Sequence, residues 1–503
     1  MKNWFLLLAL SAFAWGQKDV VVNANSFSGA DCGAKINAAE ASLASTAAAI
    51  EVDSSCGTST WSAVTLTNDH HTLRFLTPGP FTVNSITLSG SYDAIAGPAY
   101  LTQVGGTAQI EVVLKGNDDR VASITCDGSA PQTPANGTGS ACFEVLGNRN
   151  TLENNKVVTA QGNGITVAGI GASGVCSSTA NDNIIKNNLI NKVGASAVAS
   201  GITVGNNSKA AGACTNRNRI EGNTIAGTSG NCIYATADIG TSGLPTSGTQ
   251  TSDTKILNNT VSGCGDSPIE ASDMVVNTLI QGNTVDCTKN ACILSREAVS
   301  TQIIQNTVQM EPSALQAGIS IGPPIFQAPS FDNRAVVANN TVRGYVVHFG
   351  ISVSQSGARI TGNDIEDTYR PVGPDGSGLG GDGIACSGAN VSSCFIDSNQ
   401  IKHVLVGIDF NYSATAQSGR DFVATNNRIS QVGTGINLYQ LRCTNCNISK
   451  NFITQVRTVA VQDNGPNANG TGTSYSSGNI LNLPGWAGAN PKPSVQNLPG
   501  YQH

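Results

Sequence analysis

The sequence predicts an all-β fold, a parallel β-helix solenoid with a short N-terminal capping helix. Three observations lead to this prediction: a short phrase returns eleven times, a β-branched segment follows each copy, and the closest copies are 23 or 24 residues apart. A unit of that length cannot bury its apolar face alone, so consecutive copies must stack on one another. Stacked copies of this kind form a solenoid.

The returning phrase is an aliphatic residue, two spacers, an asparagine, one spacer and a second aliphatic residue, and it occurs between Arg149 and Val461. The asparagines are Asn155, Asn188, Asn223, Asn259, Asn283, Asn306, Asn340, Asn363, Asn399, Asn427 and Asn451. Asparagine tolerates the left-handed backbone that a bend needs, and its amide can bond to the same amide in the next copy. We therefore interpret this column as a structural ladder rather than as a catalytic feature.

The segments that follow the asparagines are short, β-branched and bounded by Gly, Asn and Ser, as strands are. Their centres are Ile165, Ile202, Ile233, Ile269, Ile293, Ile319, Ile351, Ile384, Ile408, Ile436 and Val461. With two or three strands in each copy and a rise of about 4.8 Å between copies, the eleven copies predict a rod of roughly 50 Å.

The N-terminal sequence predicts a secretory signal and a helix that covers the first rung. Residues 1–16 have the charged start, short apolar run and small-residue exit of a secretory signal, and the run is too short to span a bilayer. We expect a secreted chain, extracellular or periplasmic, without membrane insertion. Residues 17–48 are interpreted as a leader and an Ala-rich helix from Gly33 to Ala48, with Asp31 as its N-cap, covering the open edge of the first rung.

The rest of the chain divides by its pattern. Residues 49–148 alternate apolar and polar side chains without a clean asparagine column, and we interpret them as irregular first rungs. Residues 149–462 carry the regular rungs. Residues 463–503 are rich in Asn, Gly, Ser and Pro and are expected to form a C-terminal cap and tail over the last rung.

Fourteen cysteines in a chain with an export signal predict disulfides. The expected pairs are Cys32–Cys56, Cys126–Cys142, Cys176–Cys214, Cys232–Cys264, Cys287–Cys292, Cys386–Cys394 and Cys443–Cys446. Spacing leaves the connectivity open, because Cys264 and Cys287 occupy similar bends on adjacent rungs.

Charged residues make up 12% of the chain and its net charge is −6. The sequence therefore does not have the basic character expected for binding nucleic acid or an anionic membrane. The surface must be covered by Ser, Thr, Asn, Gln and Gly, which suit a hydroxyl-rich partner such as a polysaccharide. The alternative is that β-solenoids simply use these residues in their turns. A monomer and a homotrimer both remain open.

Two stretches carry a family resemblance: residues 29–39, GADCGAKINAA, and residues 124–128, ITCDG. With the strands between them they resemble the opening of secreted bacterial proteins of the pectin-lyase-like superfamily. The resemblance implies a right-handed parallel β-helix. It also implies a class of chemistry, namely polysaccharide lyases, hydrolases and epimerases, together with non-catalytic relatives.

The candidate site follows from the longest connection. From each ladder asparagine to the next strand centre there are 9 to 14 residues in ten copies, but 21 between Asn363 and Ile384. This stretch is charged, and its candidate functional residues are Asp364, Asp367, Tyr369, Arg370 and Asp382. Long loops on a rigid scaffold often carry function.

Two chemistries fit this region. For glycoside hydrolysis, Asp382 and Asp409 on adjacent rungs are expected within the range of about 5 to 10 Å that paired carboxyl groups need, one kept protonated by the charge of the other. For a lyase, Lys402, His403 or Arg370 would remove the proton beside a uronate carboxylate, and calcium or a cationic side chain would neutralise that carboxylate.

The candidate residues are therefore Asp382, Asp409, Asp364, Asp367 and His403 for catalysis, and Arg370, Tyr369 and Lys402 for substrate binding, with Ca²⁺ as an optional cofactor. Gly381-Asp382-Gly383-Ile384 resembles the aspartate strand of polygalacturonases, although that family's other motifs are absent. The alternatives are a solvated loop without activity and a glycan-binding adhesion protein of the cell surface. A second charged group around Glu270 and Arg296 is interpreted as an ion pair between rungs.

Overall fold

The computed structural model describes most of the chain between residues 20 and 482. The described ranges are 20–57, 59–107, 110–130, 132–133, 141–172, 175–194, 199–205, 214–237, 250–273, 275–314, 316–322, 334–346, 348–368, 379–386, 391–410, 417–438, 441–444, 446–462, 474–475 and 479–482.

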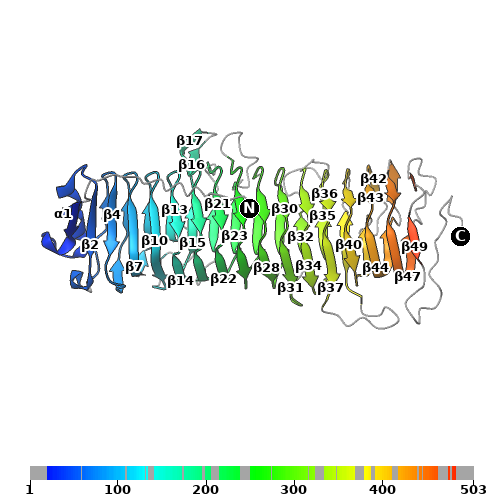
Figure 1. Ribbon diagram of the computed structural model, residues 1–503, viewed down its shortest axis with the longest axis horizontal. Coiled ribbons are helices and arrows are strands. Elements are labelled where there is room, and N and C mark those ends of the chain that lie inside the picture. The colour runs from blue at the N-terminus through cyan, green and yellow to red at the C-terminus, as the bar shows by residue number, and fades with distance from the viewer. Residues whose placement is uncertain are drawn as a thin grey trace, which may run out of the picture.

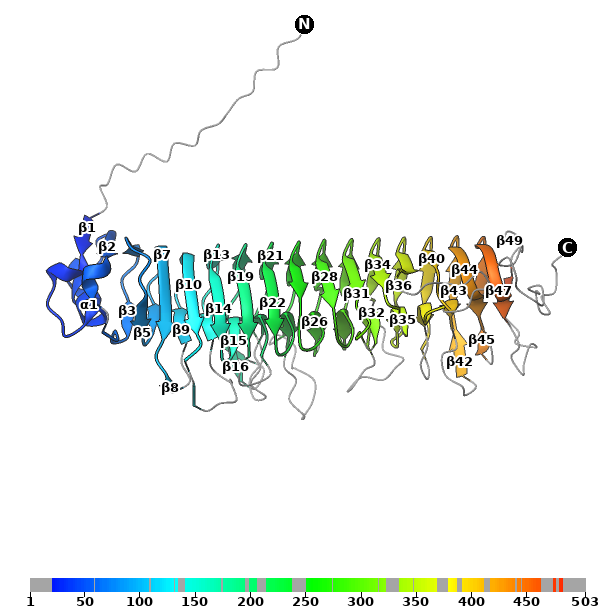
Figure 2. The ribbon, with the colours of Figure 1, turned by 90° about the horizontal axis from the view of Figure 1, so that it is seen from below.

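The described chain is a rod wound from one sheet of 43 strands (Figures 1 and 2). Strands of successive rungs pair in parallel along the rod, and the antiparallel pair β16 (Ile170–Ala172) with β17 (Val175–Ser178) stands outside this sheet. Parallel crossovers of this type are right-handed. The predicted right-handed parallel β-helix is confirmed.

Each regular rung has three strands, which form three faces of the rod. Face A precedes the ladder asparagine and contains β13 (Thr151–Glu153), β18 (Ile184–Lys186), β21 (Arg219–Glu221), β24 (Lys255–Leu257), β27 (Leu279–Gln281), β30 (Gln302–Ile304), β33 (Val336–Ala338), β36 (Arg359–Thr361), β39 (Phe395–Asp397), β43 (Val423–Thr425), β46 (Asn447–Ser449) and β48 (Ser474–Tyr475).

Face B follows the asparagine and contains β14 (Lys156–Ala160), β19 (Leu189–Val193), β22 (Thr224–Thr228), β25 (Thr260–Ser262), β28 (Thr284–Cys287), β31 (Thr307–Met310), β34 (Thr341–Gly344), β37 (Asp364–Asp367), β40 (Gln400–Lys402), the first parts of β44 (Arg428–Asn437) and β47 (Phe452–Gln462), and β49 (Ile480–Asn482).

Face C completes the rung and contains β9 (Ile110–Leu114), β12 (Ala141–Val145), β15 (Asn163–Val167), β20 (Ile202–Val204), β23 (Ile233–Thr236), β26 (Ile269–Ser272), β29 (Ile293–Arg296), β32 (Ala317–Ile321), β35 (Phe349–Val353), β38 (Asp382–Cys386), β41 (Val406–Asp409) and the second parts of β44 and β47.

The first rungs precede the regular asparagine ladder. Their strands are β1 (Val20–Asn23), β2 (Ala48–Val52), β3 (Val64–Leu66), β4 (His71–Phe75), β5 (Phe81–Val83), β6 (Ile86–Leu88), β7 (Ala94–Gln103) and β10 (Arg120–Gly128). Short extra pairs, β8 (Gly106–Thr107) with β11 (Gln132–Thr133) and β42 (Gln417–Arg420) with β45 (Leu441–Thr444), project from the same side of the rod as β16 (Figure 2).

The N-terminal cap is shorter than expected. The helix α1 covers Cys32–Leu43, and the side chain of its N-cap Asp31 accepts a hydrogen bond from the Ala34 N–H at 3.0 Å. The predicted continuation to Ala48 is wrong, because that residue begins strand β2. Part of the leader forms a strand, since β1 pairs in parallel with β2.

The asparagine ladder is confirmed, with one correction to its physical origin. Asn188 donates both its backbone N–H and its amide to the Asn223 side-chain oxygen, at 2.9 and 3.0 Å, and its amide also donates to the Leu152 carbonyl at 3.1 Å. The left-handed residue is not the ladder asparagine but the one before it, such as Asn187 at φ 56°. The ladder asparagine is therefore selected by its hydrogen bonds rather than by its backbone angles.

A second polar column, which the sequence analysis missed, runs inside the rod at the start of face A. Each backbone N–H donates to the side-chain oxygen of the next member, and the order is His71, Asp93, Asp119, Asn150, Asn183 and Asn218. All six side chains are buried. The column contains two aspartates where the later rungs have asparagines.

The pattern continues beyond the predicted last rung. The Asn451 N–H donates to the Asn479 side-chain oxygen at 2.8 Å, and strands β48 and β49 pair with β46 and β47. Of the expected C-terminal cap and tail, the described residues 474–475 and 479–482 therefore stack on the last predicted rung and extend the solenoid.

Among the described side chains, six of the predicted disulfides are present, and the alternative of Cys264 with Cys287 is excluded. The bonded pairs are Cys32–Cys56, Cys126–Cys142, Cys176–Cys214, Cys232–Cys264, Cys287–Cys292 and Cys386–Cys394. Cys446 is also disulfide-bonded, while the side chain of Cys443 lies outside the described part.

The predicted signal, residues 1–16, lies outside the described residues. Within the described chain, no helix has both the length and the apolar character needed to cross a membrane.

Candidate functional site

The charged stretch after Asn363 is not one long loop. Its first four residues, Asp364–Asp367, form strand β37 on face B, and Asp382 begins strand β38 on face C. The inserted connection is therefore 368–381. Tyr369 and Arg370, the two predicted substrate-binding residues of that connection, lie outside the described residues.

Asp382 and Asp409 lie on neighbouring strands of face C, but not at corresponding positions. In the register of β38 and β41, Asp382 stands beside Val406, and Asp409 stands beside Ala385. The two aspartates are thus three positions apart along the strand direction, rather than directly stacked. Their side chains nevertheless converge and share a hydrogen bond.

The pair is buried and electrostatically coupled. Asp382 is 7% exposed and Asp409 is 4% exposed. Burial raises the pKa of Asp382 to about 8, and the negative charge of Asp409 and the hydrogen bond with it act in the same direction. Burial and the neighbouring Asp409 therefore favour the protonated form of Asp382 well above the usual aspartate range. The Asn437 amide of the next rung donates to Asp409 at 3.0 Å, which favours a charged Asp409 carboxylate.

Two residues beside the pair were missed by the sequence analysis. Phe349 is half-buried and stands in register with Asp382, whose backbone N–H donates to the His348 carbonyl at 2.7 Å. The imidazole of His348 is exposed and lies 6.2 Å from the Phe349 ring, centre to centre. Aligning Gly350-Ile351 with Gly383-Ile384 would have placed Phe349 next to Asp382 from the sequence alone.

Asp367 lies at the bend between faces B and C. It is buried at the end of β37, and a Cβ atom on Gly380 would come within 2.4 Å of its Oδ2 atom. A Cβ atom at this position would also meet the Val346 carbonyl oxygen, so the returning chain passes too close for a larger residue. Asp367 therefore lies under the returning chain.

The remaining predicted site residues lie on face B. Asp364 forms an ion pair with Arg343, and the His403 Nδ1 atom lies 3.2 Å from a Glu366 oxygen. Lys402 lines a pocket with residues of β44 and β47. The predicted set thus separates into an acid pair on face C and a charged group on face B. Lys402 and His403 thus follow the face B side of the rod, and their roles in catalysis or binding stay predictions.

The second charged group is a buried network rather than a simple surface pair. Glu270, 4% exposed, accepts from Arg296 at 3.0 Å and from Asn231 at 2.8 Å, and the Tyr234 hydroxyl donates to Asp273 at 2.8 Å. The predicted ion pair between rungs is present. Burial raises the pKa of Glu270 while Arg296 opposes the shift. The hydrogen bonds join neighbouring rungs of face C, although the buried Arg296 Nε atom has no partner.

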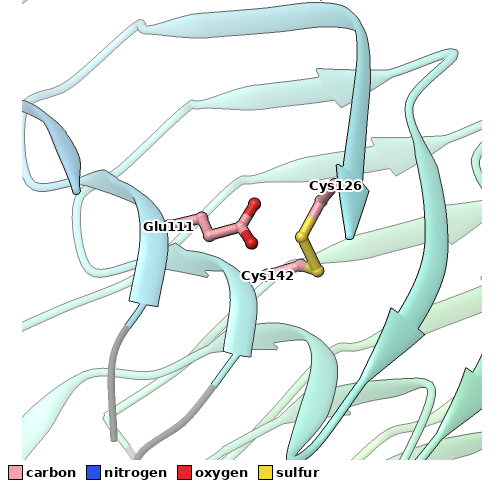
Figure 3. A group of neighbouring side chains, drawn as sticks. All are labelled: Glu111, Cys126 and Cys142. Carbon is pink, nitrogen blue, oxygen red and sulfur yellow. A yellow bond between two sulfur atoms is a disulfide. The ribbon is translucent and has the colours of Figure 1, made fainter. Parts of the chain in front are cut away.

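One group of described residues brings three potential metal ligands together: Glu111, Cys126 and Cys142, with ligand atoms within 4.8 Å of one another. Figure 3 shows the Glu111 carboxyl group directed toward the two sulfur atoms, which are joined to each other. As a disulfide these sulfurs are not thiolate ligands, so this is no metal centre. The calcium site suggested by the sequence stays a prediction.

No protein-family model and no curated protein sequence matches the chain. Among solved structures, the A-module of a mannuronan C-5 epimerase from Azotobacter vinelandii is 13% identical, with 92% of this chain and 99% of that chain covered and a TM-score of 0.36. A surface adhesin of Streptococcus pneumoniae is 13% identical over 88% and 92% of the two chains, with a TM-score of 0.40.

A tailspike protein of the E. coli bacteriophage HK620, solved in complex with a pentasaccharide, is 11% identical over 90% of this chain and 74% of that chain, with a TM-score of 0.45. Likenesses this remote are likenesses of fold. The chemistry of the present site is therefore argued from its own residues.

Proposed function

We propose that this protein cleaves a polysaccharide on face C, with Asp382 as the proton donor and Asp409 as its carboxylate partner. The observation that carries the proposal is the buried, hydrogen-bonded pair in which burial and the Asp409 charge raise the pKa of Asp382 to about 8. A general acid works best with a pKa near the operating pH, and ordinary aspartates are too acidic for this role. Asp382 meets that condition.

Hydrolysis fits this pair better than β-elimination. Glycoside hydrolysis needs one protonated carboxyl group for the leaving oxygen and one carboxylate that activates water or attacks the sugar. Asp382 and Asp409 supply these two states on adjacent strands once their mutual hydrogen bond opens, because hydrolysis needs the carboxyl groups about 5 Å or more apart with the sugar between them. A lyase would need Lys402, His403 or Arg370 as the base. Lys402 and His403 belong to face B, and His403 is engaged by Glu366 at 3.2 Å.

The side chains around the pair suit a sugar. The half-buried ring of Phe349 offers an apolar surface, and the Asn437 amide, the Thr434 hydroxyl and the His348 imidazole supply hydrogen-bonding groups nearby. In this mechanism Asp382 protonates the glycosidic oxygen, and Asp409, held by Asn437, carries the negative charge opposite the developing positive charge on the sugar.

The experiment is to incubate the full chain with a panel of neutral and acidic polysaccharides and to measure released reducing ends and unsaturated uronates. We expect reducing ends without unsaturation, and a loss of about 100-fold or more in Asp382→Asn and Asp409→Asn. Asp397→Asn is the matched control, because this aspartate lies on face A and binds Thr425 and Asn426. Activity that survives both face C substitutions excludes the pair as the site.

The second candidate function is a secreted glycan-binding or adhesion protein without turnover. The surface pocket on face B favours it, because binding there would not need the acid pair. Binding of a polysaccharide without release of any product would support this candidate over hydrolysis. For either function we propose export by residues 1–16, in keeping with the disulfides, while monomer and homotrimer remain alternatives for size measurements in solution.

A further inference from the structure

A pocket of about 580 Å³ opens on face B near the C-terminal end of the rod. Its described lining residues are Gln400, Lys402, Arg428, Ile429, Ser430, Phe452, Thr454 and Gln455. Strand register orders them in two columns that cross three rungs, one formed by Gln400, Arg428 and Phe452, and the other by Lys402, Ser430 and Thr454. The volume lies within the range of about 300 to 1,000 Å³ typical of sites for small ligands.

The pocket holds two cations without carboxylate partners among the described residues. Several other arginines of the rod form short ion pairs, as Arg219 does with Glu221 at 2.7 Å. The acid nearest in register to Lys402 is Glu366, and its carboxylate is already engaged by Arg343 and His403. In a chain of net charge −6, Lys402 and Arg428 therefore create a local positive potential.

Beside the cations stands an aromatic surface. The Arg428 guanidinium lies over the Phe452 ring at 5.8 Å from its centre, and Phe452 is only partly buried. This contact orients the guanidinium while its N–H groups remain available. Gln400, Ser430 and Thr454 add amide and hydroxyl groups around the ring.

We propose that this pocket binds an acidic sugar residue, a uronate within a polysaccharide or oligosaccharide. Arg428 and Lys402 bind the carboxylate, Phe452 packs against the apolar side of the sugar ring, and the amides and hydroxyls bind the sugar hydroxyls. A neutral sugar has no negative charge that could bind Lys402 and Arg428. Nucleic acid needs an extended series of phosphate contacts, which two cations do not provide.

The pocket is separate from the acid pair, because its strands β40, β44 and β47 contribute their face B segments, whereas Asp382 and Asp409 belong to face C. It is a binding site and touches no reacting group of the proposed hydrolysis. The inference therefore does not depend on the proposed function. Asp382→Asn should leave binding in the pocket unchanged, so failure of one idea can be told from failure of the other.

The test is calorimetric titration of the full chain with oligosaccharides of galacturonate, mannuronate and glucuronate, each beside the same oligosaccharide with its carboxyl groups reduced to alcohols. We expect binding of at least one acid form, and at least about tenfold weaker binding of its reduced form. Arg428→Gln and Lys402→Gln should each weaken the acid form about tenfold, and Arg428→Lys should retain part of the affinity.

The matched control is Arg359→Gln, which removes an arginine placed over Phe395 at 4.8 Å on face A and should leave the affinity unchanged. Unchanged melting temperatures identify variants that still fold. The proposal is overturned if no uronate oligosaccharide binds, if the reduced forms bind equally well, or if folded Arg428→Gln and Lys402→Gln both keep full affinity. Equal competition by a single-stranded oligonucleotide would identify a different class of ligand and would also overturn it.

Discussion

Asp382 and Asp409 share a hydrogen bond although their backbone positions differ by three residues in the strand register. The offset matters because two aspartates at equivalent positions of adjacent rungs would have similar surroundings. Asp382 and Asp409 stand at different positions of the rung, so their surroundings differ. Asp382 stands beside Phe349, and Asp409 stands beside Asn437. Different surroundings allow one carboxyl group to keep its proton while the other stays charged.

The pH dependence of activity follows from this pair. Asp382 donates its proton, so kcat/KM should fall as the pH rises through about 8, where burial and the charge of Asp409 place the pKa of Asp382. The measurement is a pH profile of kcat/KM on the best substrate from the polysaccharide panel.

The same coupling can be measured without a substrate. Removing the like charge in Asp409→Asn should lower the pKa of Asp382, although burial should still keep it above the ordinary aspartate value. Carbon-13 NMR of labelled aspartate would follow the titration in both proteins. A pKa of Asp382 near the usual aspartate value in the unaltered chain would contradict the assignment of Asp382 as the acid.

The sequence was enough for the solenoid, because a fixed spacing of asparagines and aliphatic residues leaves little choice of period. It was not enough for the site. Whether His403 belongs to face B or face C depends on where the bend after Ile401 begins, and residue counts do not fix that bend. The left-handed conformation of His403, at φ 54°, ends face B at this residue. The charged stretch from Asp364 to Asp382 spans faces B and C for the same reason, because residue counts do not show where its bend begins.

The ladder asparagines should be essential for stability. Asn306→Ala removes the oxygen that accepts from the Asn283 N–H and amide, both at 2.9 Å, and the amide that donates to the Ile280 carbonyl at 3.0 Å. Because these groups are buried, we expect a loss of about 2 to 4 kcal/mol in the free energy of unfolding. Thr307→Ala, at the adjacent exposed position, is the control. Equal unfolding midpoints in denaturant for the two variants would refute a role for the ladder in stability.

Glu111 should be replaceable with a gain in stability. Its carboxyl group is buried beside the Cys126–Cys142 disulfide, neither oxygen has a hydrogen-bond partner, and burial raises its pKa well above the usual value. A buried polar group without partners costs about 1 to 3 kcal/mol. Glu111→Met keeps an unbranched side chain of similar length without the polar atoms, so its melting temperature should rise at pH 8. Glu144→Met, at a partly exposed site, should show a smaller change.

The aspartates of the second polar column should make the N-terminal rungs sensitive to pH. Burial raises the pKa of Asp93 to about 7 and that of Asp119 to about 8, and Asp119 Oδ2 has no hydrogen-bond partner although it lies close to the Gly90 carbonyl. A protonated carboxyl group could donate there, as the Asn150 amide donates to the Gly116 carbonyl at 3.1 Å. The pKa of Asp119 is higher in the folded chain than in the unfolded chain, so its proton stabilises the fold. This stability is fully present below the unfolded-state pKa near 4 and is lost as the pH rises through about 8.

Replacing Asp119 by asparagine, the residue of the column in later rungs, should remove the loss of stability at high pH. Asp119→Asn supplies the donor at every pH, so we expect about 1 to 3 kcal/mol more stability than the unaltered chain at pH 9 and little difference at pH 5. Asn183→Asp is the reciprocal change: it should destabilise the rod progressively as the pH rises, because its amide donates to Asn218 at 3.1 Å. Thermal unfolding at both pH values measures each effect. A gain in Asp119→Asn that is the same at pH 5 and pH 9 would show that proton binding by Asp119 is not the cause.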